Sequence, residues 1–261
     1  MKAYRIWGII LRYLFAVRRS GDRLADIFYW PTMDLFLWGL TGSYFNSLAP
    51  DYPQVLVIIT SGIVFWIVTW RAQSDVTIGI LEELWSRNLV NLFGSPIKFS
   101  EWLVAVMTIG FLKMCASFTF AAGVAYLLYE TNIFIYGFYI IPFMLLLMMS
   151  GWWVGLLICG LIFKFGTRVQ NLAWSAIMVL APFAAIYYPV SVLPAWAQKV
   201  SALVPMSYIF EGAREVIAHG VVDPKKIIIC FILNVIYLIL ALAFIKRSYQ
   251  KILEKGLLSL Y

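Results

Sequence analysis

Residues 137–163 have the sequence GFYIIPFMLLLMMSGWWVGLLICGLIF, a run without one acidic or basic side chain. A helix that crosses the hydrocarbon core of a bilayer needs about 20 predominantly apolar residues. This stretch meets that requirement and predicts a transmembrane helix. Outward from it in both directions, five more segments meet the same test, and they are residues 28–46, 55–74, 102–128, 171–189 and 226–245.

The composition of the whole chain supports a membrane protein. It is 63% hydrophobic and 13% charged, and its mean hydropathy is +0.87. A soluble domain carries about 25% charged residues. The six segments occupy most of the chain and leave no room for a soluble catalytic domain. We therefore expect an all-α integral membrane protein, with residues 1–261 forming a single transmembrane domain of six spans.

The positions of the basic residues predict the orientation. With both termini in the cytoplasm, Lys199, Arg214, Lys225 and Lys226 fall outside, and Arg71 and Lys113 fall within or at the edge of spans. The other basic residues fall inside, as the positive-inside rule requires. We expect a multi-pass protein of the cell (inner or plasma) membrane of a bacterium or archaeon, with both termini cytoplasmic. The net charge of +7 then belongs to a cytoplasmic membrane face, and no nucleic-acid partner is expected.

The loop between the second and third expected spans has the pattern of a short helix with two faces. Residues 81–96 are LEELWSRNLVNLFGSP. The apolar face is Leu81, Leu84, Trp85, Leu89, Leu92 and Phe93, and the other face is Glu82, Glu83, Ser86, Arg87 and Asn91. Gly94 and Pro96 stop the helix, which we expect over residues 81–94. Such a helix indicates a surface against which another protein pushes.

Residues 1–26 predict an interfacial helix, which would have membrane lipids as its partners. An apolar stripe runs through Ile6, Ile9, Ile10, Tyr13, Leu14 and Val17. Arg5, Arg12 and Arg19 stand seven apart on another face, where we expect them to meet anionic headgroups. The alternative is a solvated basic tail.

Residues 190–220 predict a re-entrant helical hairpin on the outer side, before the last span. Pro194 can begin one short helix and Pro205 stops it. Ser207 can cap a second helix, which His219 and Gly220 would close. Each helix is expected to be about ten residues, roughly 15 Å, or half a bilayer. The alternative is an ordinary surface loop.

The order of these elements resembles the membrane subunit of ABC exporters of the ABC-2 family, over essentially the whole chain. The two most telling stretches are residues 81–97 (LEELWSRNLVNLFGSPI) and 188–215 (YPVSVLPAWAQKVSALVPMSYIFEGARE). The second is similar to the family's proline-containing turn, Leu-Pro, tryptophan and Pro-hydrophobic-Tyr segment running into Glu and Arg. The hairpin residues that carry this likeness are Pro194, Trp196, Pro205, Tyr208, Glu211 and Arg214.

The resemblance implies that residues 81–94 are a coupling helix that docks in a groove of an ATPase subunit. It also implies a homodimer, or a pair with a related permease, carrying two ATPases. The chain has no GxxxxGK[ST] motif, so no cofactor is expected on it, and ATP and Mg²⁺ belong to the partner. We expect Leu84, Trp85, Leu89 and Phe93 to carry the force, and Glu82, Glu83 and Arg87 to fix the docking polarity.

Charged residues within the spans are candidates for function. Asp34 and Lys113 form either a structural salt bridge or part of a substrate path. Arg71 and Asp75 stand four apart and can pair. Gly151 and Gly155 form a small-xxx-small pattern that favours close helix packing. The cysteines and the only histidine are expected to have structural roles. Cys115, Cys159 and Cys230 should pack as buried thiols, and His219 should cap a helix.

The sequence leaves the substrate open. The resemblance favours export of a drug-like, lipid or lipid-linked substrate. Permeases for cell-surface polysaccharide are the alternative, because many tryptophans and tyrosines can line a sugar path, but RRSGDRLADIFYWP lacks an expected arginine-tyrosine and Leu-Gly-Trp pattern. Other classes are a membrane-embedded lipid-modifying enzyme, a secondary transporter and a scaffold. No catalytic or metal-binding set is expected, since HExxH and GxSxG are absent and titratable residues are scattered.

Overall fold

The computed structural model describes residues 1–48 and 54–255, and this part of the chain folds into helices without any strand. The α-helices are α1 (Ala3–Arg19), α2 (Gly21–Leu48), α3 (Gln54–Trp85), α4 (Leu89–Gly94), α5 (Phe99–Tyr129), α6 (Ile140–Phe165), α7 (Leu172–Leu180), α8 (Ala195–Ser201), α9 (Pro205–His219) and α10 (Pro224–Lys255). The 3₁₀ helices are η1 (Ile133–Tyr139), η2 (Gly166–Val169), η3 (Ala181–Ala184) and η4 (Val190–Val192).

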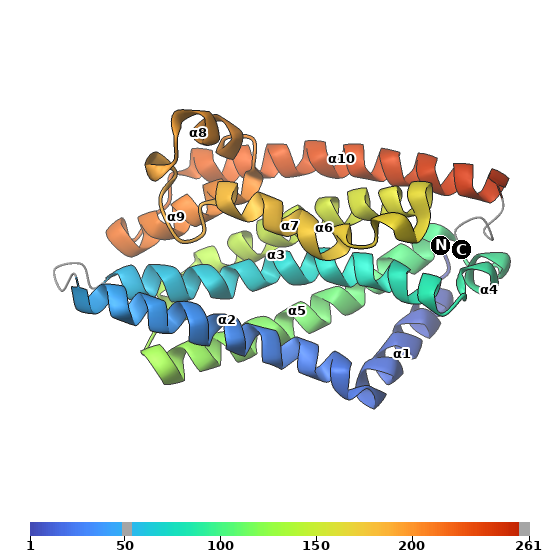
Figure 1. Ribbon diagram of the computed structural model, residues 1–261, viewed down its shortest axis with the longest axis horizontal. Helices are drawn as coiled ribbons and strands as arrows, with labels where there is room; N and C mark the ends of the chain where they lie inside the picture. Colours follow the sequence, from blue (N-terminus) through green and yellow to red (C-terminus); the bar gives the residue numbers. More distant parts are fainter. Residues whose placement is uncertain (49–53, 256–261) are drawn as a thin grey trace.

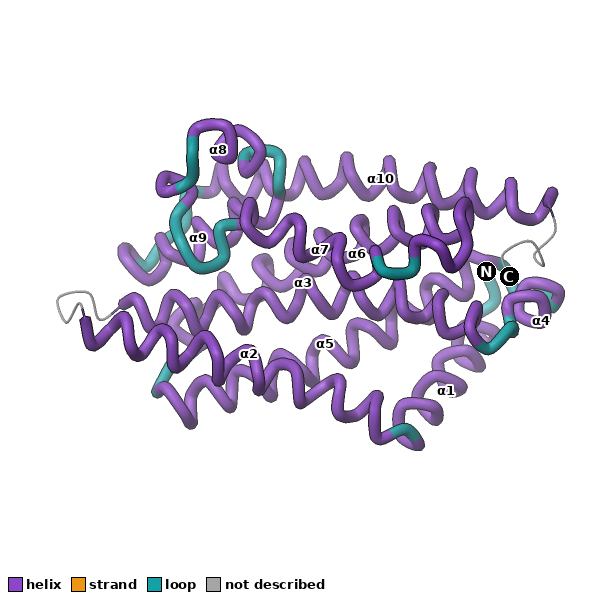
Figure 2. The backbone as a smooth tube through the Cα atoms, in the orientation of Figure 1, coloured by secondary structure: helices purple, strands orange, loops and turns teal. Residues whose placement is uncertain are grey.

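The long helices run lengthwise through the molecule, side by side (Figure 1). The N-terminus, α1, α4 and the last turns of α10 lie at one end, which we call the terminal end. The helices α8 and α9 lie toward the opposite end. Only short loops connect the helices of the described chain (Figure 2). The expected all-helical class is therefore confirmed.

Four helices are long and apolar enough to cross a membrane, and they are α3, α5, the η1–α6–η2 segment and α10. The other two expected spans, 28–46 and 171–189, fall on α2 and on α7 with η3. The segment Leu172–Ala184 is apolar but shorter than a span. The helix α2 has sufficient length, 28 residues, but it carries Asp22, Arg23, Asp26 and Asp34. These charges lower its hydropathy.

The helix α3 forms the centre of the molecule and packs against α2, α5, α6 and α7. Nearly every residue from Ile59 to Leu84 is buried. A helix covered on all sides is apolar around its whole circumference rather than along one stripe, as the sequence of α3 shows. Because α3 also touches α9, it contacts five other helices, and a displacement of α3 acts on all of them.

Two glycines allow α6 to lie against α3 at close range. A Cβ atom added at Gly151 would come within 2.6 Å of the Ala72 Cβ, and one at Gly155 within 3.0 Å of the Gln73 carbonyl oxygen. Only glycine fits such positions without a shift of the neighbouring backbone. The small-xxx-small pattern therefore packs two helices of the same chain.

Three boundaries differ from the sequence expectations. The N-terminal helix was expected over residues 1–26, but α1 ends at Arg19 and α2 begins at Gly21, because Ser20 adopts an extended backbone. The outer helices were expected to have equal length, but α8 has 7 residues and α9 has 15. Pro205 both follows α8 and begins α9, since its missing N–H costs nothing at a first helical position. Gly220 closes α9 in the left-handed conformation, as expected.

Candidate functional site

The helix expected over residues 81–94 is two helices in the structure, which corrects that expectation. The span helix α3 continues without a break to Trp85, and α4 begins only at Leu89. Between them Arg87 has a positive φ of 52°. The Asn88 side chain donates to the Glu83 carboxylate at 2.5 Å, and its backbone N–H donates to the Glu83 carbonyl at 2.9 Å. These hydrogen bonds give the Glu83 carbonyl at the end of α3 a donor and stabilise the turn between α3 and α4.

The apolar residues expected to contact an ATPase are largely inside this chain. Leu81, Leu84 and Leu89 are buried, as is Leu92. Phe93 packs against Phe99, Trp102 and Tyr249, and these rings join α4 to α5 and α10. The expectation that Leu84, Leu89 and Phe93 carry the force stays a prediction, and the structure shows that all three pack within this chain. Leu89, Leu92 and Phe93 anchor α4 to the bundle, because these apolar side chains leave water together.

The acidic residues of the same stretch also bind within the chain. The buried Glu83 carboxylate accepts hydrogen bonds from the Arg12 guanidinium at 2.6 Å and the Tyr13 hydroxyl at 2.7 Å. Burial raises the pKa of the Tyr13 hydroxyl, and the Glu83 charge raises this pKa further, so Tyr13 stays a donor at neutral pH. Glu82 pairs with Arg23 at 3.1 Å. These carboxylates therefore hold α1 and α2 against α3, and their expected role in docking polarity stays a prediction.

The arginines of α1 were expected to meet lipid headgroups, and two of them bind carboxylates of the bundle instead. Arg12 pairs with Glu83, and Arg5 lies 3.6 Å from Glu101. The buried Glu101 carboxylate also accepts the backbone N–H groups of Lys2 and Lys98. The apolar stripe of α1 is buried in part, while Trp7 and Phe15 are exposed.

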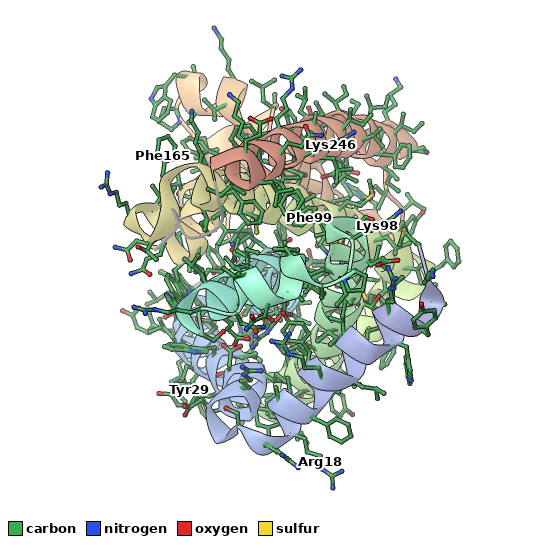
Figure 3. The ribbon with its side chains drawn as sticks, turned by 90° about the vertical axis from the view of Figure 1, so that its right-hand side faces the viewer. Arg18, Tyr29, Lys98, Phe99, Phe165 and Lys246 are labelled. Atoms are coloured by element: carbon green, nitrogen blue, oxygen red, sulfur yellow. The ribbon has the colours of Figure 1, made fainter. Side chains whose placement is uncertain are left out.

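A small surface remains exposed where α3 meets α4. Its residues are Trp85, Ser86, Arg87, Val90 and Asn91, and we call it the α3–α4 surface. Figure 3 looks onto the terminal end that carries it, with Arg18, Lys98 and Lys246 labelled at the same end. The surface combines an indole, a guanidinium and an amide over a rigid apolar base, the residue types that dominate protein interfaces.

Trp85 joins this surface to α7. Its ring stacks on Trp174 with centroids 6.3 Å apart and planes 11° apart, and its indole N–H donates to the Gln170 side chain at 3.1 Å. About half of the Trp85 side chain, 51%, remains exposed. The residue therefore contacts α7 and remains accessible from outside at the same time.

The expected pair of Asp34 and Lys113 does not form. Lys113 donates to Asp75 instead, across from α5 to α3. Arg71 and Asp75 do not pair either, because both guanidinium NH₂ groups of Arg71 bind Asp26 of α2, one at its carboxylate and one at its carbonyl. Asp34 forms no ion pair within the described residues and is half-buried.

Pro31 ties α2 to α5 next to Asp34. Proline lacks an N–H, so the carbonyl of Ile27 loses its helical donor. The Ser117 hydroxyl of α5 donates to that carbonyl at 3.0 Å. This hydrogen bond fixes the first part of α2 against α5, beside the residues that line the cavities.

Two cavities lie beside α2. The first, about 180 Å³, is walled by α1, α2, α3 and α5, and Asp22, Asp26, Asp75 and Glu82 line it; we call it the acidic cavity. The second, about 340 Å³, is walled by α2, α3 and α7, and Trp30, Trp66, Trp70, Trp174 and Asp34 line it; we call it the tryptophan cavity. Asp26 and Ile78 line both, so the two cavities are neighbours.

The hairpin residues hold the outer segment together. The Glu211 carboxylate accepts from the Val190 N–H at 2.6 Å and from Arg214 at 2.9 Å. The Tyr208 hydroxyl donates to the Ala202 carbonyl at 2.8 Å. Pro194 precedes α8, and Trp196 packs edge-on against Phe183 while most of its surface is exposed. Ser207 was expected to cap α9, but its hydroxyl donates to the carbonyls of Ser201 and Val204, so it joins the two helices.

Sequence reasoning missed two buried amides. Asn234 of α10 accepts from Ser150 at 2.8 Å and from Trp153, and donates to the Leu146 carbonyl at 3.1 Å. Gln73 of α3 donates to the Ala173 carbonyl of α7 at 3.0 Å. For Asn234 the signal is an amide in the middle of an apolar segment, since an amide without a hydrogen-bond partner is costly in apolar surroundings. Gln73 lies between Arg71 and Asp75, so the sequence gives no such signal there.

No protein-family model matches this chain, and no curated protein matches it. Within the described residues, no group of three His, Cys, Asp or Glu side chains is arranged to hold a metal ion. Cys159 and Cys230 are buried, Cys115 is half-buried, and all three are free thiols.

Proposed function

We propose that this chain is the permease subunit of an ATP-driven exporter of the ABC-2 type. In this proposal the chain spans the cell membrane six times and moves a drug-like, lipid or lipid-linked substrate. A separate ATPase subunit supplies the energy, and two permeases, identical or related, share the path. The proposal starts from the resemblance carried by residues 81–97 and 188–215.

The observation that supports it best is the position of the α3–α4 surface. Arg87, Val90 and Asn91 are exposed on a base whose apolar side chains are buried in the bundle. A force applied there reaches α3 directly through the turn and reaches α7 through the Trp85–Trp174 stack. Both helices wall the tryptophan cavity. A partner that docks at this surface can therefore change the shape of the cavity.

The docking contact differs from the one that the sequence alone suggested. Glu83 binds Arg12 and Leu84 is buried within the chain. A substitution that changes the charge of Glu83 or the polarity of Leu84 would therefore damage the fold rather than the docking contact. The residues that remain for a partner are Trp85, Arg87, Val90 and Asn91. An arginine beside an indole suits an acidic groove with an apolar floor.

The test is purification of the tagged chain from its native cells in mild detergent, with mass spectrometry of the proteins that co-purify. We expect a P-loop ATPase in about equal amount. The double substitution Arg87→Glu/Val90→Glu should lower its recovery at least about tenfold, because interface arginines often contribute about 2 kcal/mol or more.

The matched control is Lys225→Glu, an exposed charge reversal near the start of α10 at the opposite end. It should leave ATPase recovery unchanged. A folded chain that purifies without any ATPase contradicts the proposal. Equal recovery with both variants would remove the α3–α4 surface as the docking site.

A further inference from the structure

We propose that the tryptophan cavity binds a lipophilic organic cation, with the Asp34 carboxylate as its counter-ion. This inference rests on the proposed function, because it names the class of substrate that the proposed permease would transport. The binding itself can be measured on the purified chain alone.

The first argument is the balance of charge in the cavity. It is lined by two acidic residues and one basic residue. The basic residue, Arg71, does not neutralise Asp34, because both of its NH₂ groups bind Asp26. The Asp34 carboxylate is left without an ion pair within the described residues. A ligand with one positive charge would compensate it at a depth where an isolated charge is costly.

The second argument is the chemistry of the walls. Four tryptophans, from α2, α3 and α7, line the cavity. Tryptophan has the ring face that attracts cations best, and the attraction grows when water is excluded. Trp66 is almost completely buried at 6% exposure, whereas Trp30 is 57% exposed. The cavity thus has a dry inner wall and an open outer one.

The third argument separates a cation from a sugar. A sugar also stacks on indole rings, but each of its hydroxyl groups needs a hydrogen-bond partner. Besides the committed pair of Asp26 and Arg71, the polar side chains that line the cavity are Asp34 and Ser74. Eight of the twelve lining residues are apolar. This lining suits a ligand with one charge and a large apolar surface, and its volume of about 340 Å³ falls in the range of small-molecule sites.

The neighbouring acidic cavity adds further carboxylates beside the tryptophan cavity. Asp22 and Asp26 stand about one helical turn apart on α2, and Asp34 follows about two turns later, where it lines the tryptophan cavity together with Asp26. Five carboxylates and three basic side chains line the two cavities together, although the chain carries a net charge of +7. A locally negative region in a protein of positive net charge raises the concentration of cations near it.

The test compares two ions of the same shape and opposite charge, tetraphenylphosphonium and tetraphenylborate. Binding to the purified chain in phosphatidylcholine nanodiscs is measured by quenching of tryptophan fluorescence and by equilibrium dialysis, with empty nanodiscs subtracted. We expect the cation to bind and the anion to bind at least about tenfold more weakly. Asp34→Asn should weaken cation binding about tenfold, and Trp30→Ala about fivefold.

Two control variants are matched to these. Glu254→Gln removes an exposed carboxylate near the end of α10, and Trp7→Ala removes an indole of α1 that is 58% exposed, nearly the same as Trp30. Neither lines the tryptophan cavity, and both should bind the cation as the unchanged chain does. Circular dichroism verifies that all four variants keep their helices.

Three outcomes would overturn the inference. Equal binding of the two ions, or binding unchanged by Asp34→Asn, removes the counter-ion. Preference for the borate assigns the cavity to anions through Arg71. Binding of maltohexaose that is lost in Trp30→Ala and kept in Asp34→Asn assigns it to sugars. A failure of ATPase recovery leaves these binding results unaffected, so the two proposals fail separately.

Discussion

At the scale of single residues, the charges inside the bundle are arranged as specific pairs between helices. Lys113 of α5 binds Asp75 of α3, and Arg71 of α3 binds Asp26 of α2. Each ion pair fixes the axial position of one helix relative to its neighbour. Asp34 is the exception, and it lies in a cavity rather than against a partner.

Reversal of the charge at either Asp75 or Lys113 should destabilise the protein by about 3 kcal/mol, because it leaves a buried charge against a like charge. The double swap, Asp75→Lys with Lys113→Asp, should recover at least half of the loss. Thermal unfolding in detergent, followed by size-exclusion fluorescence, measures both. The swap of Asp34 with Lys113 should recover nothing, and recovery there would contradict the pairing described above.

At the scale of helices, the sequence predicted where apolar segments lie but not where they end. The second span was expected to finish at residue 74, yet α3 continues to Trp85. The continuation contains Asp75 and Thr77, which a hydropathy window counts as costly. Lys113 neutralises Asp75, and Thr77 donates to the carbonyl of Gln73 within its own helix. For Asp75 the partner comes from a distant part of the chain, which a local hydropathy window does not contain.

The same limit explains the candidate site. Of the expected apolar face, Leu81, Leu84, Leu89 and Leu92 are buried while Trp85 is half exposed, and periodicity does not say whether such residues pack against their own chain or against another protein. An Asp34–Lys113 salt bridge was one of two alternatives for these intramembrane charges, and the geometry pairs Lys113 with Asp75 instead. The sequence pattern identified which apolar and charged residues matter. Which residue each one contacts could be determined only from the packing of the helices.

The packing of α6 on α3 gives a prediction for glycine. Gly151→Ala should destabilise the protein by about 1–3 kcal/mol, because the added methyl group overlaps Ala72 and the Gln73 backbone. Gly123→Ala in α5 is the control, since nothing lies within 4 Å of its added Cβ. That variant should be neutral or more stable by up to about 1 kcal/mol through helix propensity. Equal effects of the two, in thermal unfolding, would contradict the close approach.

At the scale of the whole molecule, the basic residues divide between the two ends of the bundle. Arg18, Lys98 and Lys246 lie at the terminal end (Figure 3), while Lys199 belongs to α8 near the opposite end (Figure 1). The positive-inside rule predicts from such a division that the terminal end faces the cytoplasm, and this orientation stays a prediction.

Cysteine labelling in intact cells tests that orientation. In a background with Cys115, Cys159 and Cys230 changed to Ala, Lys246→Cys should react with a membrane-impermeant maleimide only after the cells are permeabilised. Lys199→Cys, also exposed, should react in intact cells. Labelling of both positions from the same side would contradict the six-span arrangement, because α8 and the end of α10 would then share one compartment.

The length of α3 has a mechanical consequence. At about 1.5 Å per residue its 32 residues measure about 48 Å, longer than the roughly 30 Å of a bilayer's hydrocarbon core. It is an uninterrupted rod whose far tip carries Trp85. Counted from Gln54, Trp70 stands about 24 Å along it and Trp85 about 47 Å. If such a rod pivoted at Gln54, a tilt of about 10° would shift Trp70 by about 4 Å and Trp85 by about 8 Å, so a movement at the tip would reach the tryptophan cavity at half its size.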